Sequence, residues 1–455
     1  MVKASFRGMA SLILFIAGSI VSTGSYALPF SITPTAGISL PTEVLPGHTV
    51  TAIYTVTNNT SAVRSGNFVK YLPPNVTQVA VDPVYSDLCG SAFTLNPRGA
   101  SGSSCTLELK ISGNVNASDP DPHHHLFVCF PGGITCAGTP NPLNVSTKTV
   151  SAPKHVYISN YNANTVSICS VNPSTGQLIL CQDSGAGAVF NTPIDISFNP
   201  DKSRLYAGDF NNSAGTSVLD CLVNAATGTL SGCSNVDGDG SAVFSGPSFV
   251  AFSFTGSNAY VSNLASGIIS LCLVNTSTGQ FTGCASAGSG FSFPVELNLS
   301  IRGTRAYVGN DASSTTISLC TVDTATGVLT GCANADGDGT AVFAGPAFIA
   351  FNADETRVYV SNNNSGTGTT VTLCSVNLVT GKLTSCQDSG AGAIFTSPGS
   401  VRLNPANTLI YIANQTGTSV TLCSVNPTTG LLSGCINADG DGTAVFSGPA
   451  GIILK

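Results

Sequence analysis

The sequence predicts an all-β protein: a six-bladed β-propeller over residues 153–455, preceded by an Ig-like β-sandwich over residues 28–150. Two observations predict the propeller. Strand-like segments recur about every 50 residues from residue 154 onward, and each repeat contains two cysteines 12 positions apart. A fixed repeat of this length, with four short strands in each unit, is typical of propeller blades.

Each repeat divides into four expected strands, which we label a to d from the ring axis outward. Strand b is centred on Tyr, in HVYISN, RLYAGD, NAYVSN, RAYVGN, RVYVSN and LIYIAN. Strand c ends at the first cysteine, and a Thr-Gly turn such as NPSTGQ leads to strand d and the second cysteine. A loop then leads to a Pro-led strand a, such as PSFVAF. Alternating apolar and polar residues, punctuated by Asn and Gly, favour strands and turns over helices.

The two ends of the repeat array predict how the ring closes. The array begins with a Tyr strand at His155 and has no Pro-led strand before it, whereas it ends with a lone Pro-led segment, GPAGIILK. We expect this last segment to pair with the first Tyr strand. The pairing would complete the first blade, give six blades, and remove the open edges of the ring.

The sixteen cysteines predict disulfides, because the chain carries an export signal. Within a repeat, the two cysteines lie symmetrically about the Thr-Gly turn, where facing residues of a hairpin are within disulfide reach. We therefore expect one bridge between strands c and d of every blade. The expected pairs are Cys169 with Cys181, Cys221 with Cys233, Cys272 with Cys284, Cys320 with Cys332, Cys374 with Cys386 and Cys423 with Cys435, and upstream Cys89 with Cys105 and Cys129 with Cys136.

The N-terminal residues 1–27 are typical of a secretory signal peptide. Lys3 and Arg7 precede an apolar stretch too short to span a bilayer, and Ser25-Tyr26-Ala27 offers a cleavage site. We expect a secreted, periplasmic or cell-surface protein without a membrane span. The net charge is −7 and no basic run occurs, which argues against nucleic acid as a partner.

The repeat also resembles a known family. The segments AYVSN, RVYVSN and LIYIAN, each followed by a TVxxCxVxxxTG-like stretch, are similar to the YVTN-type repeats of lactonase-like β-propellers. The resemblance covers about residues 154–455 and implies the propeller fold more firmly than any activity. The cysteine pairs, and a count of six blades rather than the seven usual in lactonase-like propellers, depart from the family pattern.

A two-blade period within the array points to the ring axis. The Pro-led strands of blades 2, 4 and 6 read PIDISF, PVELNL and PGSVRL, and they place Asp195, Glu296 and Arg402 near the axis. Charged groups on innermost strands must be paired or hydrated. They could form a structural salt-bridge cluster with channel water, which we favour, or a ligand-binding or catalytic site in the channel mouth.

Only the even repeats contain an Asp-Gly-Asp-Gly segment, which resembles the first half of a calcium loop. A full EF-hand loop also needs an acidic residue at position 12, where this chain has Gly246, Gly345 or Gly448. Asp and Gly also suit a tight turn between blades, which is the interpretation we favour over a weak structural calcium site. The candidate calcium ligands are Asn235, Asp237, Asp239, Asn334, Asp336, Asp338, Asn437, Asp439 and Asp441.

Other candidate sites are weaker. His123, His124 and His125 could bind a transition metal, although a solvated loop is the favoured interpretation. His155 is the one histidine of the propeller region, so a Ser-His-Asp hydrolase is not expected there. No Trp occurs, so the Cys…Trp…Cys hallmark of Ig domains is missing.

Two main hypotheses remain open at this point, beside a purely structural role in a cell-surface layer. The first hypothesis is an exported, non-catalytic propeller that binds a protein or carbohydrate through the Asn- and Asp-rich face formed by the b–c and d–a loops. The alternative is a lactonase-like enzyme that uses Asp195, Glu296 and Arg402 in the channel. No cofactor is expected except calcium. The sequence does not identify the ligand or the oligomeric state.

Overall fold

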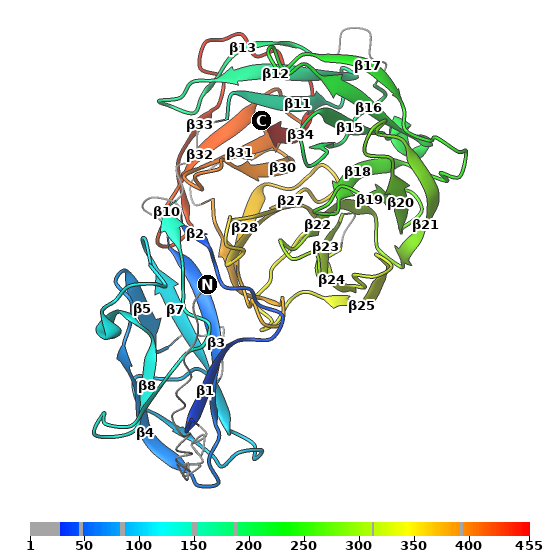
Figure 1. Ribbon diagram of the computed structural model, residues 1–455. Coiled ribbons are helices and arrows are strands. Elements are labelled where there is room, and N and C mark those ends of the chain that lie inside the picture. The colour runs from blue at the N-terminus through cyan, green and yellow to red at the C-terminus, as the bar shows by residue number, and fades with distance from the viewer. Residues whose placement is uncertain are drawn as a thin grey trace, which may run out of the picture.

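The structure is a computed structural model, and it describes residues 28–44, 49–81, 87–147, 153–184, 190–311, 314–390 and 395–455. The predicted leader, residues 1–27, lies outside the described residues. Within them the regular secondary structure is almost entirely β, which confirms the predicted all-β class (Figure 1). The helical elements of the described ranges are two short 3-10 turns, η1 (Pro122–His124) and η2 (Asn211–Ser213).

The N-terminal region contains two four-stranded sheets, ordered β1-β3-β7-β5 and β6-β4-β8-β9, and a small parallel pair, β2-β10. Residues of both larger sheets share one buried core, for example Phe30, Tyr54, Leu95 and Val128. This is a two-sheet sandwich, whereas its Ig-like assignment stays a prediction. The strands are β1 (Phe30–Pro34), β2 (Glu43–Val44), β3 (Val50–Asn58), β4 (Arg64–Tyr71), β5 (Val76–Val79), β6 (Phe93–Leu95), β7 (Ser104–Ile111), β8 (Phe127–Cys129), β9 (Cys136–Gly138) and β10 (Ser146–Thr147).

The repeat region forms six four-stranded antiparallel sheets among the described residues. The chain enters the first sheet at strand b, and its last strand supplies strand a of that sheet, as predicted from the chain ends. In each sheet, strands b, c and d follow one another in the sequence. Their hairpin connections place consecutive strands side by side. The b strands are β11 (His155–Asn160), β15 (Arg204–Asp209), β19 (Asn258–Asn263), β23 (Arg305–Asn310), β27 (Arg357–Asn362) and β31 (Leu409–Asn414).

Strands c and d form the outer half of each sheet. The c strands are β12 (Thr165–Val171), β16 (Ser217–Val223), β20 (Ile268–Val274), β24 (Ile317–Val322), β28 (Thr370–Val376) and β32 (Val420–Val425). The d strands are β13 (Leu178–Asp183), β17 (Leu230–Asn235), β21 (Phe281–Ser289), β25 (Leu329–Asn334), β29 (Leu383–Asp388) and β33 (Leu432–Asn437). Each d strand pairs with c around a bulge at the cysteine pair.

The innermost a strands contact one another in cyclic order around the axis (Figure 1). The last one contacts both its predecessor in the sequence and the first a strand of the array, as expected for a propeller. We number the blades 1 to 6 from the blade that contains both β11 and the C-terminal strand. In this order the a strands are β34 (Pro449–Leu454), β14 (Ile196–Phe198), β18 (Pro247–Phe252), β22 (Pro294–Leu299), β26 (Pro346–Phe351) and β30 (Pro398–Leu403).

A tyrosine on strand b links each blade to the next one. Its buried hydroxyl donates a hydrogen bond to the carbonyl of the Thr-Gly turn in the following blade, and a side chain on that glycine would collide with the neighbouring blade. These glycines also have φ between 75° and 80°, which disfavours other residues. The six bonds are Tyr157–Gly228, Tyr206–Gly279, Tyr260–Gly327, Tyr307–Gly381, Tyr359–Gly430 and, between blades 6 and 1, Tyr411–Gly176.

The eight disulfides confirm the cysteine pairs that the spacing predicts. Six of them link strands c and d of the six ring sheets, and two lie in the sandwich. The ring pairs are Cys169 with Cys181, Cys221 with Cys233, Cys272 with Cys284, Cys320 with Cys332, Cys374 with Cys386 and Cys423 with Cys435. The sandwich pairs are Cys89 with Cys105 and Cys129 with Cys136. Eight disulfides indicate an oxidising environment.

The hairpins around the ring disulfides correct the expectation of symmetric facing pairs. The register shifts at the cysteine of strand c, because the residue before the cysteine of strand d is an extra residue in the left-handed conformation. In blades 1 and 5 this residue is not glycine but Leu180 and Ser385, with φ of 52° and 51°. The cysteines of strand c are buried, whereas those of the outermost strand d, namely Cys181, Cys233, Cys284, Cys332, Cys386 and Cys435, are half-buried or exposed.

The described residues include no helix that is long and apolar enough to cross a membrane.

Candidate functional site

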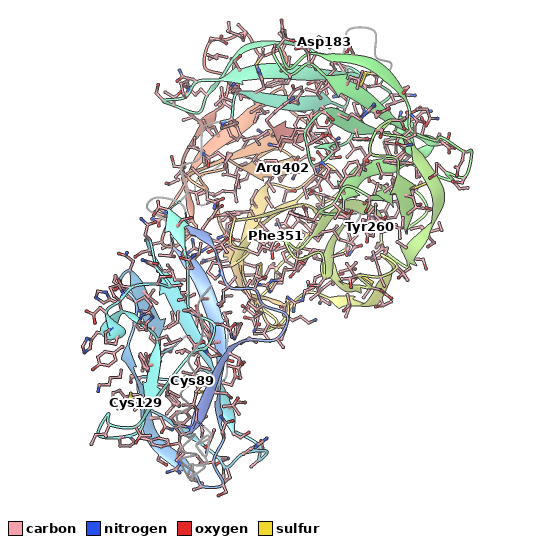
Figure 2. All side chains as sticks on the ribbon, viewed as in Figure 1. Cys89, Cys129, Asp183, Tyr260, Phe351 and Arg402 are labelled. Carbon is pink, nitrogen blue, oxygen red and sulfur yellow. A yellow bond between two sulfur atoms is a disulfide. The ribbon has the colours of Figure 1, made fainter. Side chains whose placement is uncertain are left out.

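The three charged residues predicted near the axis come together there. Asp195 immediately precedes β14, Glu296 is the third residue of β22 and Arg402 is the fifth residue of β30. These strands belong to blades 2, 4 and 6, so the side chains reach the axis from every second blade. Figure 2 shows Arg402 inside the ring of strands.

Arg402 bridges the two acids. Its Nη2 lies 2.8 Å from Glu296 Oε1 and donates to Asp195 Oδ2 at 3.0 Å, while its Nη1 donates to the carbonyl of Val401 at 2.8 Å. Each acid also accepts a backbone N–H: Glu296 Oε2 from Ile349 at 2.7 Å, and Asp195 Oδ1 from the residue that follows it, at 2.9 Å. The cluster is therefore held by four different segments of the ring.

Two carboxylates share one guanidinium, so the cluster carries a formal charge of −1 if both acids are ionised. Burial raises the pKa of Asp195, and the neighbouring Glu296 raises it further, against the opposing effect of Arg402. The two acids together raise the pKa of Arg402, although burial alone would lower it. Burial of Asp195 thus favours the protonated form of its carboxyl group.

The cluster is open to solvent through Arg402. The side chains of Asp195 and Glu296 are 0% exposed, whereas that of Arg402 is 16% exposed. Arg402 also lies two strand positions nearer the a–b turns than Glu296, since the two occupy the fifth and third places of their strands. Solvent therefore reaches the cluster from the a–b side of the ring.

The opposite mouth of the channel is closed by an apolar cluster, which corrects the expectation that this face gathers polar groups around the axis. Buried side chains from loops and strand starts of several blades meet there and exclude water from that side of the acids. The cluster comprises Ile194, Phe210, Val295, Ala347 and Phe348, with Tyr161 and Leu264 packed against it.

The asparagines at the ends of the b strands lie on that face, where the sequence predicted ligand-binding groups. Their side chains instead form hydrogen bonds within the ring. Asn263 is typical: its amide donates to Ser270 Oγ at 2.9 Å, and its oxygen accepts the N–H of Ser245 at 3.1 Å. Asn160, Asn310, Asn362 and Asn414 make equivalent bonds and are buried. These amides hold the loops that precede the a strands.

The Asp-Gly-Asp-Gly segments connect each even blade to the next odd blade. The second Asp of each segment uses one carboxylate oxygen to accept a backbone N–H of its own loop and the other to accept the N–H of the left-handed residue beside the next disulfide. The second set of bonds joins Asp239 to Gly283 at 2.9 Å, Asp338 to Ser385 at 2.8 Å and Asp441 to Leu180 at 2.8 Å. This is the role expected of an interblade turn.

The first Asp of each segment, and the Asn before it, also accept hydrogen bonds from backbone N–H groups of their own loop. Asp237 and Asp439 accept the N–H groups of Gly240 and Gly442 at 2.9 Å, and the preceding asparagines, Asn235 and Asn437, accept the N–H of these aspartates. Asn334 and Asp336 do the same in the middle copy. Calcium binding by these residues stays a prediction.

His123 and His124 of the sandwich pair with neighbouring acids. His123 Nδ1 lies 2.8 Å from Asp121 Oδ1, and His124 Nδ1 lies 2.9 Å from Asp119 Oδ2. His125 Nε2 lies 2.7 Å from the carbonyl of Asp119. In the part of the chain that the structure describes, no group of three or more His, Cys, Asp or Glu side chains is placed to hold a metal ion.

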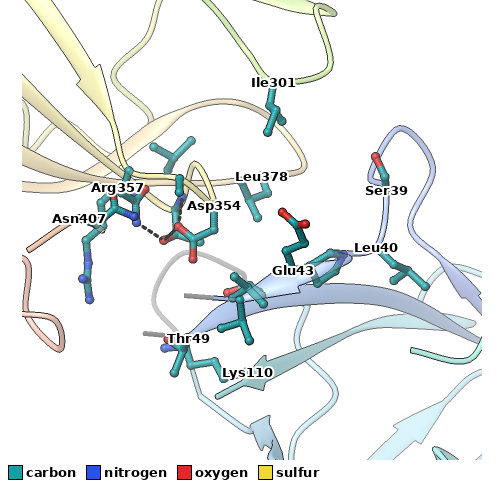
Figure 3. Close-up of a pocket in the computed structure, with 18 of the residues that line it drawn as sticks. Ser39, Leu40, Glu43, Thr49, Lys110, Ile301, Asp354, Arg357, Leu378 and Asn407 are labelled. Atoms are coloured by element: carbon teal, nitrogen blue, oxygen red, sulfur yellow. Dashed lines mark hydrogen bonds between the residues drawn. The ribbon is translucent and has the colours of Figure 1, made fainter. Parts of the chain in front are cut away.

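The sequence did not predict a cavity between the sandwich and the a–b face of the ring (Figure 3). Its volume is about 840 Å³, within the range of small-molecule sites. It lies apart from the charged cluster, because its lining contains none of Asp195, Glu296 or Arg402. The cavity depends on how two regions of the chain dock, and no local sequence pattern specifies that docking.

Comparison with known proteins supports the propeller interpretation. A sequence model described as "Lactonase, 7-bladed beta-propeller" matches residues 333–445, which run from the end of β25 to the loop before β34. That description names seven blades, whereas the described residues form six four-stranded sheets. The chain is therefore similar in sequence to lactonase-like propellers over part of its length. No curated protein matches the chain.

The chain also matches solved structures, among them those of three bacterial proteins. A Lactobacillus plantarum protein is 17% identical over 67% of this chain and 99% of its own, with a TM-score of 0.47. A putative 6-phosphogluconolactonase from Bacteroides fragilis is 16% identical over 75% and 96%, with a TM-score of 0.45. A periplasmic gluconolactonase from Pseudomonas aeruginosa is 14% identical over 72% and 94%, with a TM-score of 0.45. At such low identities and TM-scores, these similarities carry no argument about activity.

Proposed function

We propose that the protein is a lactonase-like hydrolase that opens a lactone ring at the charged cluster of Asp195, Glu296 and Arg402. The observation that carries the proposal is this cluster, in which a guanidinium and a carboxyl group of raised pKa meet at the axis of a propeller. The sequence match to lactonase-like propellers over residues 333–445 supports the same function.

The three side chains have complementary roles in the proposed reaction. Arg402, which solvent reaches, would donate hydrogen bonds to the carbonyl oxygen of the lactone and stabilise the negative charge that forms there. Asp195, once ionised, would take a proton from the attacking water, and its raised pKa suits a base that works near neutral pH. Glu296, bound to Arg402, would keep the guanidinium in place.

The bonds of the reaction balance without a cofactor. The water oxygen forms a bond to the carbonyl carbon, and the ring carbon–oxygen bond breaks. The proton taken up by Asp195 passes to the departing ring oxygen. The product is a hydroxy acid, which ionises and releases a proton to solvent. Ring opening can therefore be followed as acid release.

The test is a pH-stat assay of the mature protein with a panel of five- and six-membered sugar lactones. We expect turnover that falls at least about a hundredfold in Glu296→Gln and in Arg402→Lys, since both variants disturb the groups around the reacting atoms. Asp201→Asn, an exposed acid on an a–b turn, is the matched control and should keep full activity. Circular dichroism checks that each variant is folded. Absence of turnover with every lactone contradicts the proposal.

A non-catalytic binding protein is the second candidate. The complete burial of both carboxylates favours it, because a salt-bridge cluster that only holds blades together would look the same. In that case the ring presents binding surfaces, and ligand binding without lactone turnover would be observed.

We further propose six blades, an Ig-like class for the sandwich, and export of the mature chain, with 28–150 and 153–455 as the two domains. Six blades are supported by the cyclic contacts of the a strands and the six tyrosine bonds. Export is supported by the eight disulfides. Mass spectrometry of the secreted protein, with its first residue at Leu28, tests the export proposal.

A further inference from the structure

Direct contacts between the sandwich and the ring border the cavity. Arg302, on an a–b turn of the ring, donates to the carbonyls of Gly37 at 2.7 Å and Ser39 at 3.2 Å, and to Ser39 Oγ at 3.2 Å. Ile38 and Ile53 of the sandwich share a buried apolar cluster with Leu378 of the ring. Both contacts lie beside the cavity, since Ser39, Arg302 and Leu378 are among its lining residues, and they join the two regions that form it.

Charged side chains of both signs line the cavity in equal number. The acids are Glu43, Glu108 and Asp354, and the bases are Lys110, Arg302 and Arg357. Each side of the cavity contributes both signs, since Glu43, Glu108 and Lys110 belong to the sandwich and the others to the ring. A formal sum of zero gives no long-range preference for a cation or an anion.

The charged groups on the ring side are held in position by hydrogen bonds. Arg357 donates to the carbonyl of Pro427 at 3.1 Å and to that of Thr428, both in the next blade. Asp354 accepts the N–H of Thr356 at 3.2 Å and its hydroxyl at 2.7 Å. From the sandwich side, Glu43 points into the space opposite Asp354 (Figure 3). The two carboxylates therefore face the cavity from different domains.

The remaining lining adds neutral polar groups and aliphatic surface. Asn352, Asn407, Thr42 and Ser375 supply amides and hydroxyls, and Leu40, Val44, Ile301 and Leu378 supply aliphatic carbons. No aromatic side chain is among the lining residues that the structure describes. Donors and acceptors thus both line a cavity whose formal charges sum to zero, and a ligand must offer both to use them.

We propose that this cavity is a binding site for a neutral oligosaccharide. A sugar hydroxyl donates to one group and accepts from another, so it can bind the carboxylates and the guanidinium or amide groups at once. The aliphatic side chains would contact the sugar C–H groups. The volume of about 840 Å³ lies near the upper end of the range for small-molecule sites, so the cavity has room for an oligosaccharide. Because both domains contribute, a bound saccharide would also hold the sandwich against the ring.

The proposal is tested by isothermal titration calorimetry of the mature protein with neutral tetrasaccharides of glucose, N-acetylglucosamine and mannose. We expect one of them to bind with a dissociation constant below about 1 mM. Glu43→Ala and Asp354→Asn should each weaken binding about tenfold, because each removes a charge-assisted acceptor from the cavity. Asp354→Asn keeps the oxygen that accepts from Thr356, and Glu43 is exposed, so both variants should fold.

Asp388→Asn is the control, because it removes an equal charge from an exposed position on the outer strand β29, and it should bind like the wild type. A tetralysine peptide and its fully acetylated form distinguish a polycation site. Binding of the peptide without binding of any saccharide overturns the proposal, and so does saccharide binding that neither cavity variant changes. Failure of all probes overturns it as well. Lactone turnover has no part in this test, so the two proposals stand or fall separately.

Discussion

Replacing Tyr411 by Phe tests whether the ring is closed between its last and first blades. The hydroxyl of Tyr411 donates to the carbonyl of Gly176 at 2.6 Å, and the side chain is 0% exposed. The variant loses this bond and leaves the carbonyl of Gly176 without its side-chain donor. A buried hydrogen bond contributes about 1 kcal/mol and an unsatisfied partner costs about 1–3 kcal/mol, so we expect the free energy of unfolding to fall by about 1.5 kcal/mol.

Tyr307→Phe is the matched control, because Tyr307 makes the same bond to Gly381 at 2.8 Å between blades 4 and 5, which adjoin in the sequence. Urea unfolding followed by far-ultraviolet circular dichroism measures both variants. In a closed ring the two losses should agree within about 0.5 kcal/mol. If Tyr307→Phe is destabilised while Tyr411→Phe is as stable as the wild type, the last blade does not pack on the first and the closed ring is refuted.

Three further predictions concern a strained turn, a buried acid and the blade connections. Leu180→Gly should raise the free energy of unfolding by about 1 kcal/mol, because Leu180 is exposed with a φ of 52° and glycine adopts this conformation without strain; a loss of stability in urea unfolding would contradict this. The pKa of Asp195 is raised in the folded state to about 8, so its contribution is complete at acidic pH and is lost as pH rises from about 4 through 8. The melting midpoint of the wild type should therefore decline more than that of Asp195→Asn over this range, and parallel curves would refute the shift. Calcium and chelator should give the same melting midpoint, because the carboxylates of Asp239, Asp338 and Asp441 already accept backbone N–H bonds; a rise with calcium would assign a metal to these loops.

The elements that the sequence predicted correctly depend on local patterns. Strands, Thr-Gly turns and disulfide pairs repeat six times, so each element is supported by five other copies of itself. The left-handed residue beside each second cysteine could not be predicted in the same way. Glycine occupies this position in four blades, but Leu180 and Ser385 replace it in the other two, and neither residue type favours a positive φ.

The candidate site was predictable only in part. The charged residues of three Pro-led strands predicted that Asp195, Glu296 and Arg402 lie near the axis. The apolar closure of the opposite mouth was not predictable, because it is assembled from residues of separate loops such as Phe210 and Phe348. The cavity beside the sandwich depends on bonds from Arg302 to backbone carbonyls, which every residue possesses. Contacts of this kind leave no pattern in the sequence.

The three two-blade units have the same residues in some places and different residues in others, depending on where their side chains meet. At the Asp-Gly-Asp-Gly connections each unit contacts its neighbour, and in all three units the second Asp accepts a backbone N–H from the equivalent position of the next blade. At the axis all three units meet one another. A third acid in place of Ser400 would bring three carboxylates together without a cation, and burial makes such a cluster strongly unfavourable.

The third unit instead supplies Arg402 two positions further along its strand, and this guanidinium neutralises the charge of one acid and binds both. Blade 1 makes room for the cluster, because a side chain at Gly451 would come within 2.5 Å of Asp195 Oδ1. Electrostatics and packing at the axis therefore require different residues at equivalent positions of the a strands. This holds whether or not the cluster reacts with a substrate. For this reason lactone turnover in the wild type, compared with Glu296→Gln, decides the function, and the asymmetry of the repeats alone does not.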